Sequence, residues 1–438
     1  MLKEFRFSNF GSFRDETVLS MEAVGLKELK EAPRKDGSDT LLPLAAIYGK
    51  NGGGKTNVLC AFWYAVRFVC NAQQTQHENA PIPVVPFLLD DTSKQAPTSF
   101  NFEYRMDGVR YWYGFSATKE KICSESLSHA PKGQKALVFS REGQNFTFRN
   151  NADKKKRELI RELVAENQLF LAVASGTNDA DCKRAMSWFR QYLFNGNDYN
   201  DFFDQVYKNA DNPAIIKAMS DYANAADVGI DHIEVKQDTE FERWKENWKE
   251  NVSMGIFPSD FPDNVRSSLK RVLEINPDVE ETPQRLQIKS LHKVTGEDGK
   301  SRLFDLPSHF ESDGTRNLMG LVPVLERVLD CGGVLIMDEL ENGMHPLLVK
   351  MILSRFQSPR TNPKNAQLIF TTHSAELLDM SILRKDQIYL ADKDRETGVS
   401  SLYSVSDFST PTHENVRKAY LAGKYGASPD IQIEEVAP

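Results

Sequence analysis

Residues 44–56 read LAAIYGKNGGGKT: an apolar run, a glycine-rich turn, and then a lysine and a threonine. The apolar run predicts a buried strand, and the residues from Lys55 onward predict a helix. The string from Gly49 to Thr56 matches the pattern G-x-x-x-x-G-K-[ST], which binds phosphate groups when it lies between a strand and a helix. A plain glycine-rich turn with an exposed lysine is the alternative, and the flanking strand and helix favour the phosphate-binding loop.

The glycines of this loop allow backbone amides to point at phosphate oxygens, and the N-terminus of the following helix adds a partial positive charge. We expect Lys55 to contact the β- and γ-phosphates of a nucleotide and the Thr56 hydroxyl to ligate magnesium. The residues expected to contact the nucleotide here are Asn51, Gly52, Gly53, Gly54, Lys55, Thr56 and Asn57.

Residues 334–339, VLIMDE, predict a buried parallel strand with two carboxylates at its C-terminal end. Ligands of open α/β sheets bind at that end of the strands. Asp338 would hold magnesium through its water shell, and Glu339 would orient or deprotonate the attacking water. Alone, this pattern fits a solvated strand end equally well, but the phosphate-binding loop in the same chain favours the catalytic interpretation.

Residues 367–378, QLIFTTHSAELL, predict another apolar strand, which ends at Thr372, His373 and Ser374 before a helix. A histidine at a strand end is by default a capping or surface residue. We expect this strand to neighbour the one that ends at Asp338, so that the His373 imidazole approaches the γ-phosphate and the attacking water.

A fourth segment begins at Ser312 and reads SDGTRNLMGLVPVLERVL. Ser-Asp-Gly-Thr before an apolar helix is typical of an N-cap turn, since these side chains satisfy free backbone amides. The same free amides, with a glycine and a hydroxyl, also make an anion site. Ser312 and Gly314 are therefore candidates for contact with a phosphate, and the capping turn is the alternative.

The order of strand and helix signals predicts an α/β fold with an antiparallel side sheet, split by a helical insertion. We expect residues 1–149 to form the first half of the nucleotide-binding domain, with a hairpin in FNFEYRMDGVRYWYGFSA; residues 150–280 to form the insertion; and residues 281–438 to form the second half. The basic run from Lys154 to Arg157 fits a solvated helix face better than a contact with a phosphate backbone.

Composition and charge limit the partners and the cellular compartment that can be expected for this chain. The 438 residues carry a net charge of −8, which argues against binding nucleic acid over the whole surface, and nucleic acid stays an open alternative as a partner. The N-terminus alternates polar and apolar residues and resembles no signal peptide, and no apolar stretch is long enough to span a membrane. The five cysteines form no CxxC pair. We therefore expect a cytoplasmic protein without a membrane partner.

Taken in order, these segments resemble the ABC ATPase superfamily, including SMC and RecF proteins, so the resemblance implies an ABC-type P-loop fold that uses ATP and Mg²⁺. In that superfamily the S-x-G-x segment contacts the γ-phosphate bound by the opposite subunit. Ser312 and Gly314 would then act in trans, which implies a homodimer or a higher homo-oligomer closed around ATP. Glu341 and His345, in LENGMHP after the acidic pair, would lie at the dimer contact.

A narrower resemblance covers nearly the whole chain. FRFSNFGSFRDETVLSM, PFLLDD, NQLFLAVAS and the terminal YLAGKYGASPDI are similar to the RloA and AbiL-type ATPases of bacterial restriction-linked and phage-abortive operons. This resemblance implies an ATPase (ATP and water to ADP and phosphate) that acts as a nucleotide-driven switch in anti-phage defence. It also implies a separately encoded effector, a nuclease or toxin.

Two other functions remain open from the sequence. A RecF-like DNA-repair ATPase would bind DNA across the ATP dimer, with an affinity that falls steeply with salt. A scaffold would use ATP only as structural glue, and its activity would survive loss of the Glu339 carboxylate.

Overall fold

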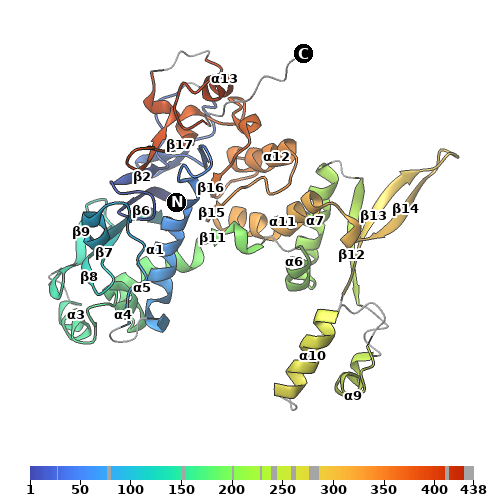
Figure 1. Cartoon of the computed structure of the whole chain (residues 1–438), viewed down its shortest axis with the longest axis horizontal. Helices are drawn as coiled ribbons and strands as arrows, with labels where there is room; N and C mark the ends of the chain where they lie inside the picture. The colour runs from blue at the N-terminus through green and yellow to red at the C-terminus, as the bar shows by residue number, and fades with distance from the viewer. Residues whose placement is uncertain are drawn as a thin grey trace. The chain divides into compact units, whose positions relative to one another are not determined.

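The computed structural model describes residues 1–26, 28–75, 80–149, 153–199, 202–226, 229–237, 244–257, 263–275, 286–409 and 414–428 (Figure 1). The chain forms two compact units. Unit 1 comprises Met1–Tyr199 and Val324–Pro438, and unit 2 comprises Asn200–Pro323. The boundaries expected at residue 150 and at residues 280 and 281 lie outside the described residues.

The central sheet of unit 1 has six strands in the order β11-β15-β16-β5-β17-β18. The first five strands pair in parallel, and β18 pairs antiparallel with β17. Every residue of β5, β15 and β16 is buried, which explains why these strands are continuous apolar runs. The strands are β5 (Leu44–Tyr48), β11 (Leu193–Asn195), β15 (Val334–Met337), β16 (Gln367–Thr371), β17 (Ile388–Lys393) and β18 (Ser400–Ser404).

A second sheet in unit 1 has seven strands, and each neighbouring pair is antiparallel. Asp107 and Gly108 join two of its strands as a tight turn, and both have positive φ, as a two-residue type I′ hairpin requires. In sheet order the strands are β10 (Asn145–Phe148), β9 (Ala136–Glu142), β8 (Ile122–Ala130), β7 (Val109–Ala117), β6 (Thr98–Met106), β1 (Leu2–Ser8) and β2 (Thr17–Ser20).

Aromatic rings join the helices of unit 1 to this second sheet. Phe62 of helix α1 (Lys55–Thr75) packs edge-on against Phe102, with ring centroids 5.3 Å apart. Trp188 of helix α5 (Ala180–Gln191) stacks on Tyr104, with ring centroids 4.0 Å apart. Residues 153–199, expected in the insertion, therefore belong to unit 1, because their apolar side chains share its core.

The remaining elements of unit 1 connect or cover the two sheets. They are β3 (Arg34–Asp36), β4 (Asp39–Leu41), α2 (Asp91–Gln95), α3 (Lys154–Arg161), α4 (Phe170–Gly176), α12 (Pro346–Gln357) and α13 (Val416–Leu421), with 3-10 turns at Gly196–Tyr199, Ala375–Leu377, Lys385–Gln387 and Val405–Asp407. Helix α11 (Asp313–Cys331) begins in unit 2 and ends in unit 1.

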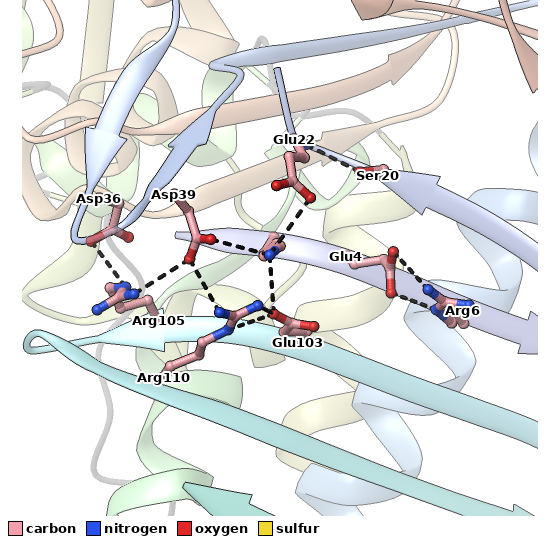
Figure 2. A network of polar contacts seen from close by, with 10 residues as sticks. Glu4, Arg6, Ser20, Glu22, Asp36, Asp39, Glu103, Arg105 and Arg110 are labelled. Atoms are coloured by element: carbon pink, nitrogen blue, oxygen red, sulfur yellow. Dashed lines mark hydrogen bonds and ion pairs between the residues drawn. The ribbon is translucent and has the colours of Figure 1, made fainter. Parts of the chain in front are cut away.

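A network of charged side chains ties the β3–β4 hairpin to the antiparallel sheet (Figure 2). Asp39 lies 3.1 Å from Lys3 Nζ, 3.3 Å from Arg105 and 3.7 Å from Arg110. Glu103 lies 3.5 Å from Lys3 Nζ and also pairs with Arg110. Burial alone would raise the pKa of Asp39, but the Lys3, Arg110 and Arg105 cations lower it. The network therefore holds four strands together through charges that are largely sheltered from water.

Unit 2 contains a three-stranded antiparallel sheet in the order β12-β13-β14. The alternation in residues 285–294 predicts the central strand, but β13 and β14 belong to unit 2, whereas residues from 281 onward were expected in the second half of the nucleotide-binding domain. The strand β12 lies in a region expected to be helical. Trp244 and Trp248 share a small apolar cluster with Val252. The elements are β12 (Ile230–Gln237), β13 (Leu286–Thr295), β14 (Ser301–Pro307), α6 (Phe202–Asn209), α7 (Pro213–Ala225), α9 (Trp248–Ser253), α10 (Asp263–Ile275) and a 3-10 turn at Ser308–Phe310.

Over the described ranges, no helix combines the length and the apolar character needed to cross a membrane.

The basic run at the start of α3 contains both exposed and buried side chains. Lys155 and Lys156 are exposed, but Arg157 is fully buried. Its guanidinium forms two hydrogen bonds with Asp179, at 2.8 and 3.1 Å, and a third with Asp181 at 2.8 Å. Burial acts to raise the pKa of Asp179, but the hydrogen bond from Arg157 lowers it overall. The pair therefore joins α3 to the start of α5.

Arg157→Met should lower the free energy of unfolding by roughly 3–5 kcal/mol, because it leaves a buried carboxylate without its cation. Arg161→Ala, at an exposed arginine of the same helix, should change it by no more than about 0.5 kcal/mol. Urea denaturation followed by tryptophan fluorescence measures both. Equal midpoints for the two variants would contradict the structural role of Arg157.

Candidate functional site

The loop from Gly49 to Thr56 is held against strands β17 and β18. Gly49 and Gly54 have φ of 149° and 113°. A Cβ atom at Gly49 would collide with the Ala391 carbonyl oxygen, and one at Gly54 would lie 2.8 Å from Ser400 Oγ. Only glycine fits these two positions, since both the conformation and the space exclude a side chain.

Lys55 opens α1 and turns its side chain back into the loop. The side chain is buried, and Nζ donates to the carbonyl oxygens of Gly49, at 2.9 Å, and Lys50, at 3.3 Å. Burial lowers the pKa of Lys55, whereas the nearby carboxylates act in the opposite direction. By contrast, Lys50 of the same loop pairs with Asp392 at 2.7 Å.

Asp338 follows β15 and accepts hydrogen bonds from two threonines. Thr56 Oγ1 lies 3.0 and 3.2 Å from the two carboxylate oxygens, and Thr371 Oγ1 donates at 2.5 Å. Thr371 Oγ1 also accepts the Glu339 N–H at 2.8 Å. The side chain of Asn197 bonds to both the N–H and the carbonyl oxygen of Asp338, at 2.9 and 3.3 Å. Asp338 is thus held from three segments of unit 1.

His373 lies between the acidic residues and the lysine. Its Nε2 is 3.3 Å from a Glu339 oxygen, and its Nδ1 is 3.5 Å from Lys55 Nζ. The His373 N–H donates to Glu341 at 2.8 Å. Glu339 has φ of 50°, an uncommon conformation for a residue with a side chain. The structure therefore brings Lys55, Thr56, Asp338, Glu339 and His373 together.

The two asparagines expected to contact the nucleotide differ in their surroundings. Asn51 is exposed at the tip of the turn, whereas the Asn57 side chain donates to Ser12 Oγ at 2.8 Å. Ser400 Oγ donates to the same Ser12 hydroxyl at 2.8 Å. The Asn57 side chain thus fastens the start of α1 to the turn between β1 and β2.

Ser312 and Gly314 lie at the start of α11 and belong to unit 2, whereas the other predicted site residues belong to unit 1. Ser312 Oγ accepts the Thr315 N–H at 3.2 Å and lies 2.8 Å from the Thr315 hydroxyl. The capping turn considered from the sequence is therefore present. His345 likewise caps a helix, since its Nδ1 accepts the Leu347 N–H at the start of α12.

A family model described as "AAA domain, putative AbiEii toxin, Type IV TA system" matches residues 44–379, which is well over half of the chain. The chain belongs to this AAA family. The match begins at β5 and extends past His373, so it contains the residues that the structure brings together. They lie in an α/β fold with a P-loop.

No curated protein matches the chain. Among solved structures, the chain is similar to "Crystal structure of the SmcHead bound to the C-winged helix domain of ScpA", with 12% sequence identity and a TM-score of 0.40. The similarity covers 92% of this chain and 97% of that chain.

Two side chains of this AAA-family chain contact Asp338 but were not singled out from the sequence. Thr371 is the last residue of β16 and lies two residues before His373. This position at the strand end was the one signal in the sequence that could have indicated a contact with Asp338. Asn197 follows the three-residue strand β11, which is too short to be recognised. Its contact with Asp338 depends on the pairing of β11 with β15.

Thr371→Val should lower the free energy of unfolding by roughly 1–3 kcal/mol, because it leaves the Glu339 N–H without an acceptor and removes a donor to Asp338. Thr371→Ser keeps the hydroxyl and loses one methyl group, so it should cost only about 0.8 kcal/mol. Urea denaturation of both variants tests this. A smaller loss for valine than for serine would show that the hydroxyl does not hold the acidic residues.

Proposed function

We propose that this chain is an ATPase that binds ATP with Mg²⁺ at the loop Gly49–Thr56 and hydrolyses the γ-phosphate bond. One observation carries the proposal: a lysine, a hydroxyl–carboxylate pair and a glutamate–histidine pair converge at one edge of a parallel sheet. The family description, which names an AAA domain, supports the same activity.

Each group has a separate task in this mechanism. Lys55 neutralises charge on the β- and γ-phosphates, and the amides of Gly52, Gly53 and Gly54 bind phosphate oxygens. Thr56 and Asp338 supply the oxygen ligands that a magnesium ion prefers, and the ion would offset the charge of the triphosphate.

In this proposal Glu339 accepts a proton from the attacking water, and the His373 imidazole donates to the γ-phosphate. The 3.3 Å contact between them keeps both side chains directed at the same space. Thr371 acts as a positioning residue, since its hydroxyl fixes the backbone of Glu339.

We propose in addition that two copies close around ATP, with Ser312 and Gly314 of one copy contacting the γ-phosphate held by the other. The free amides at the start of α11 favour an anion there. Closure by ATP and opening after hydrolysis would make the dimer a switch, because the nucleotide would bind the closed state more tightly.

The biological role that we propose is anti-phage defence, in which the switch controls a separately encoded nuclease or toxin. The family description names a putative AbiEii toxin and a type IV TA system, and a defence operon is compatible with it.

Lys55→Ala should weaken ATP binding by about 10- to 100-fold, because it removes a charged donor to the phosphates. Lys50→Ala is the matched control: Lys50 lies in the same loop but pairs with Asp392, so ATP affinity should stay within about threefold of wild type. Calorimetric titration with Mg-ATP measures both. Equal losses in the two variants would argue against a specific role for Lys55.

Glu339→Gln should bind ATP and lower kcat for hydrolysis by at least about 100-fold, because the amide cannot accept the proton. It should also accumulate the closed dimer. Light scattering should then show a gain of mass only with ATP and magnesium, and a second change, Ser312→Arg, should abolish that gain.

The control for the second change is Ser301→Arg, at an exposed serine of the same unit, which should keep the gain. If every variant has one mass under all conditions, the dimer switch is wrong, whereas loss of hydrolysis in Glu339→Gln would still support the ATPase.

A further inference from the structure

A cavity of about 720 Å³ lies along one flank of helix α1 in unit 1. Its α1 wall includes Thr56, Cys60, Trp63, Arg67 and Asn71, which recur three or four positions apart and so share one face of the helix. Phe10 and residues 80–83 also line the cavity. The cavity ends at Asn195, Asn197 and Asp338.

Most of this cavity lies away from the phosphate-binding loop. A helix rises about 1.5 Å per residue, so the wall from Thr56 to Asn71 is roughly 22 Å long. Phosphates bind at the N-terminus of a helix, next to Lys55. The phosphates of a nucleotide held there would lie at the Thr56 end of the cavity, about three helical turns from Arg67.

The floor of the cavity is aromatic. The rings of Tyr64 and Phe68 stack with centroids 5.9 Å apart, and Phe10 packs 5.5 Å from Tyr64. Leu59 and Ile82 add buried aliphatic surface. Volumes of about 300–1,000 Å³ with mostly apolar walls and a few polar groups are typical of small-molecule sites.

Charge is distributed unevenly along the cavity. Arg67 is exposed and forms no ion pair with any described residue, while Asp338 lies at the other end. An anionic group is therefore favoured at the Arg67 end and disfavoured at the Asp338 end.

We propose that this cavity is a second ligand site, which binds a small amphipathic anion with its planar apolar body on the aromatic floor and its anionic group against Arg67. The site meets the proposed ATPase centre at Thr56 and Asp338 and extends beyond it to Arg67, and ligand binding at the Arg67 end does not depend on ATP hydrolysis.

The test uses 8-anilinonaphthalene-1-sulfonate, whose fluorescence rises in apolar surroundings, with the full chain and without nucleotide. We expect one saturable site. The matched neutral probe is N-phenyl-1-naphthylamine, which has the same rings and lacks the sulfonate. Arg67→Ala should weaken binding of the sulfonate probe by about tenfold or more, since this probe makes a charged contact with Arg67. The affinity for the neutral probe should not change.

Cys60→Phe places a ring in the cavity from an exposed position and should weaken both probes by about tenfold or more, with an unchanged circular dichroism spectrum. Arg190→Ala, at an exposed arginine of α5 that does not line the cavity, is the control and should leave both affinities unchanged. The proposal would be overturned if the wild-type chain showed no saturable site. It would also be overturned if Arg67→Ala and Cys60→Phe both bound the sulfonate probe as tightly as wild type.

Discussion

Parallel pairing of β5, β16 and β15 is the constraint on which the candidate site depends. Ile47 pairs with Thr371, and Phe370 pairs with Met337, so the C-terminal ends of three strands meet at one edge. The segments that follow these ends carry the phosphate loop, the acidic pair and His373. Since backbone hydrogen bonds of buried strands fix this register, groups from three distant parts of the chain meet within hydrogen-bond distance.

Electrostatics then explains why the proposed nucleotide and cation would bind together. Three carboxylates, Asp338, Glu339 and Glu341, act on the buried Lys55 and oppose the lowering of its pKa by burial. A triphosphate entering this space meets one lysine and three negative groups. A divalent cation at Thr56 and Asp338 removes much of that repulsion, because close charges interact strongly where water is excluded.

The elements that the sequence predicts best are those with continuous apolar runs. Residues 44–48, 334–337 and 367–371 are buried on both faces, and their strands could be recognised from composition alone. The contacts of Thr371 and Asn197 with Asp338 could not, because they depend on which strands are neighbours. Asn197 and Asp338 are 141 positions apart, and no local pattern contains that information.

Helical periodicity was also insufficient to assign residues 153–199 to a unit. The spacing of apolar residues in α5 identifies a buried face but does not identify the surface that covers it. Trp188 packs on Tyr104 of β6, and this contact places the helix in unit 1. By contrast, β12 lies within the expected helical block because its partner, β13, supplies hydrogen bonds that local sequence does not reveal.

The α1 cavity and the candidate ATPase centre share Thr56 and Asp338, and this sharing has a thermodynamic consequence. A ligand that alters the position or charge environment of either residue changes the affinity for a cation held by both. Linkage then requires the cation to change the ligand's affinity by the same factor. Because Arg67 lies eleven residues after Thr56 on the same helix, an anion at the Arg67 end would lie about three helical turns from Thr56. The anion would therefore change the affinity for the cation by shifting α1. The N-terminus of this helix is fixed by the hydrogen bonds of Lys55 and by the contact of Asn57 with Ser12.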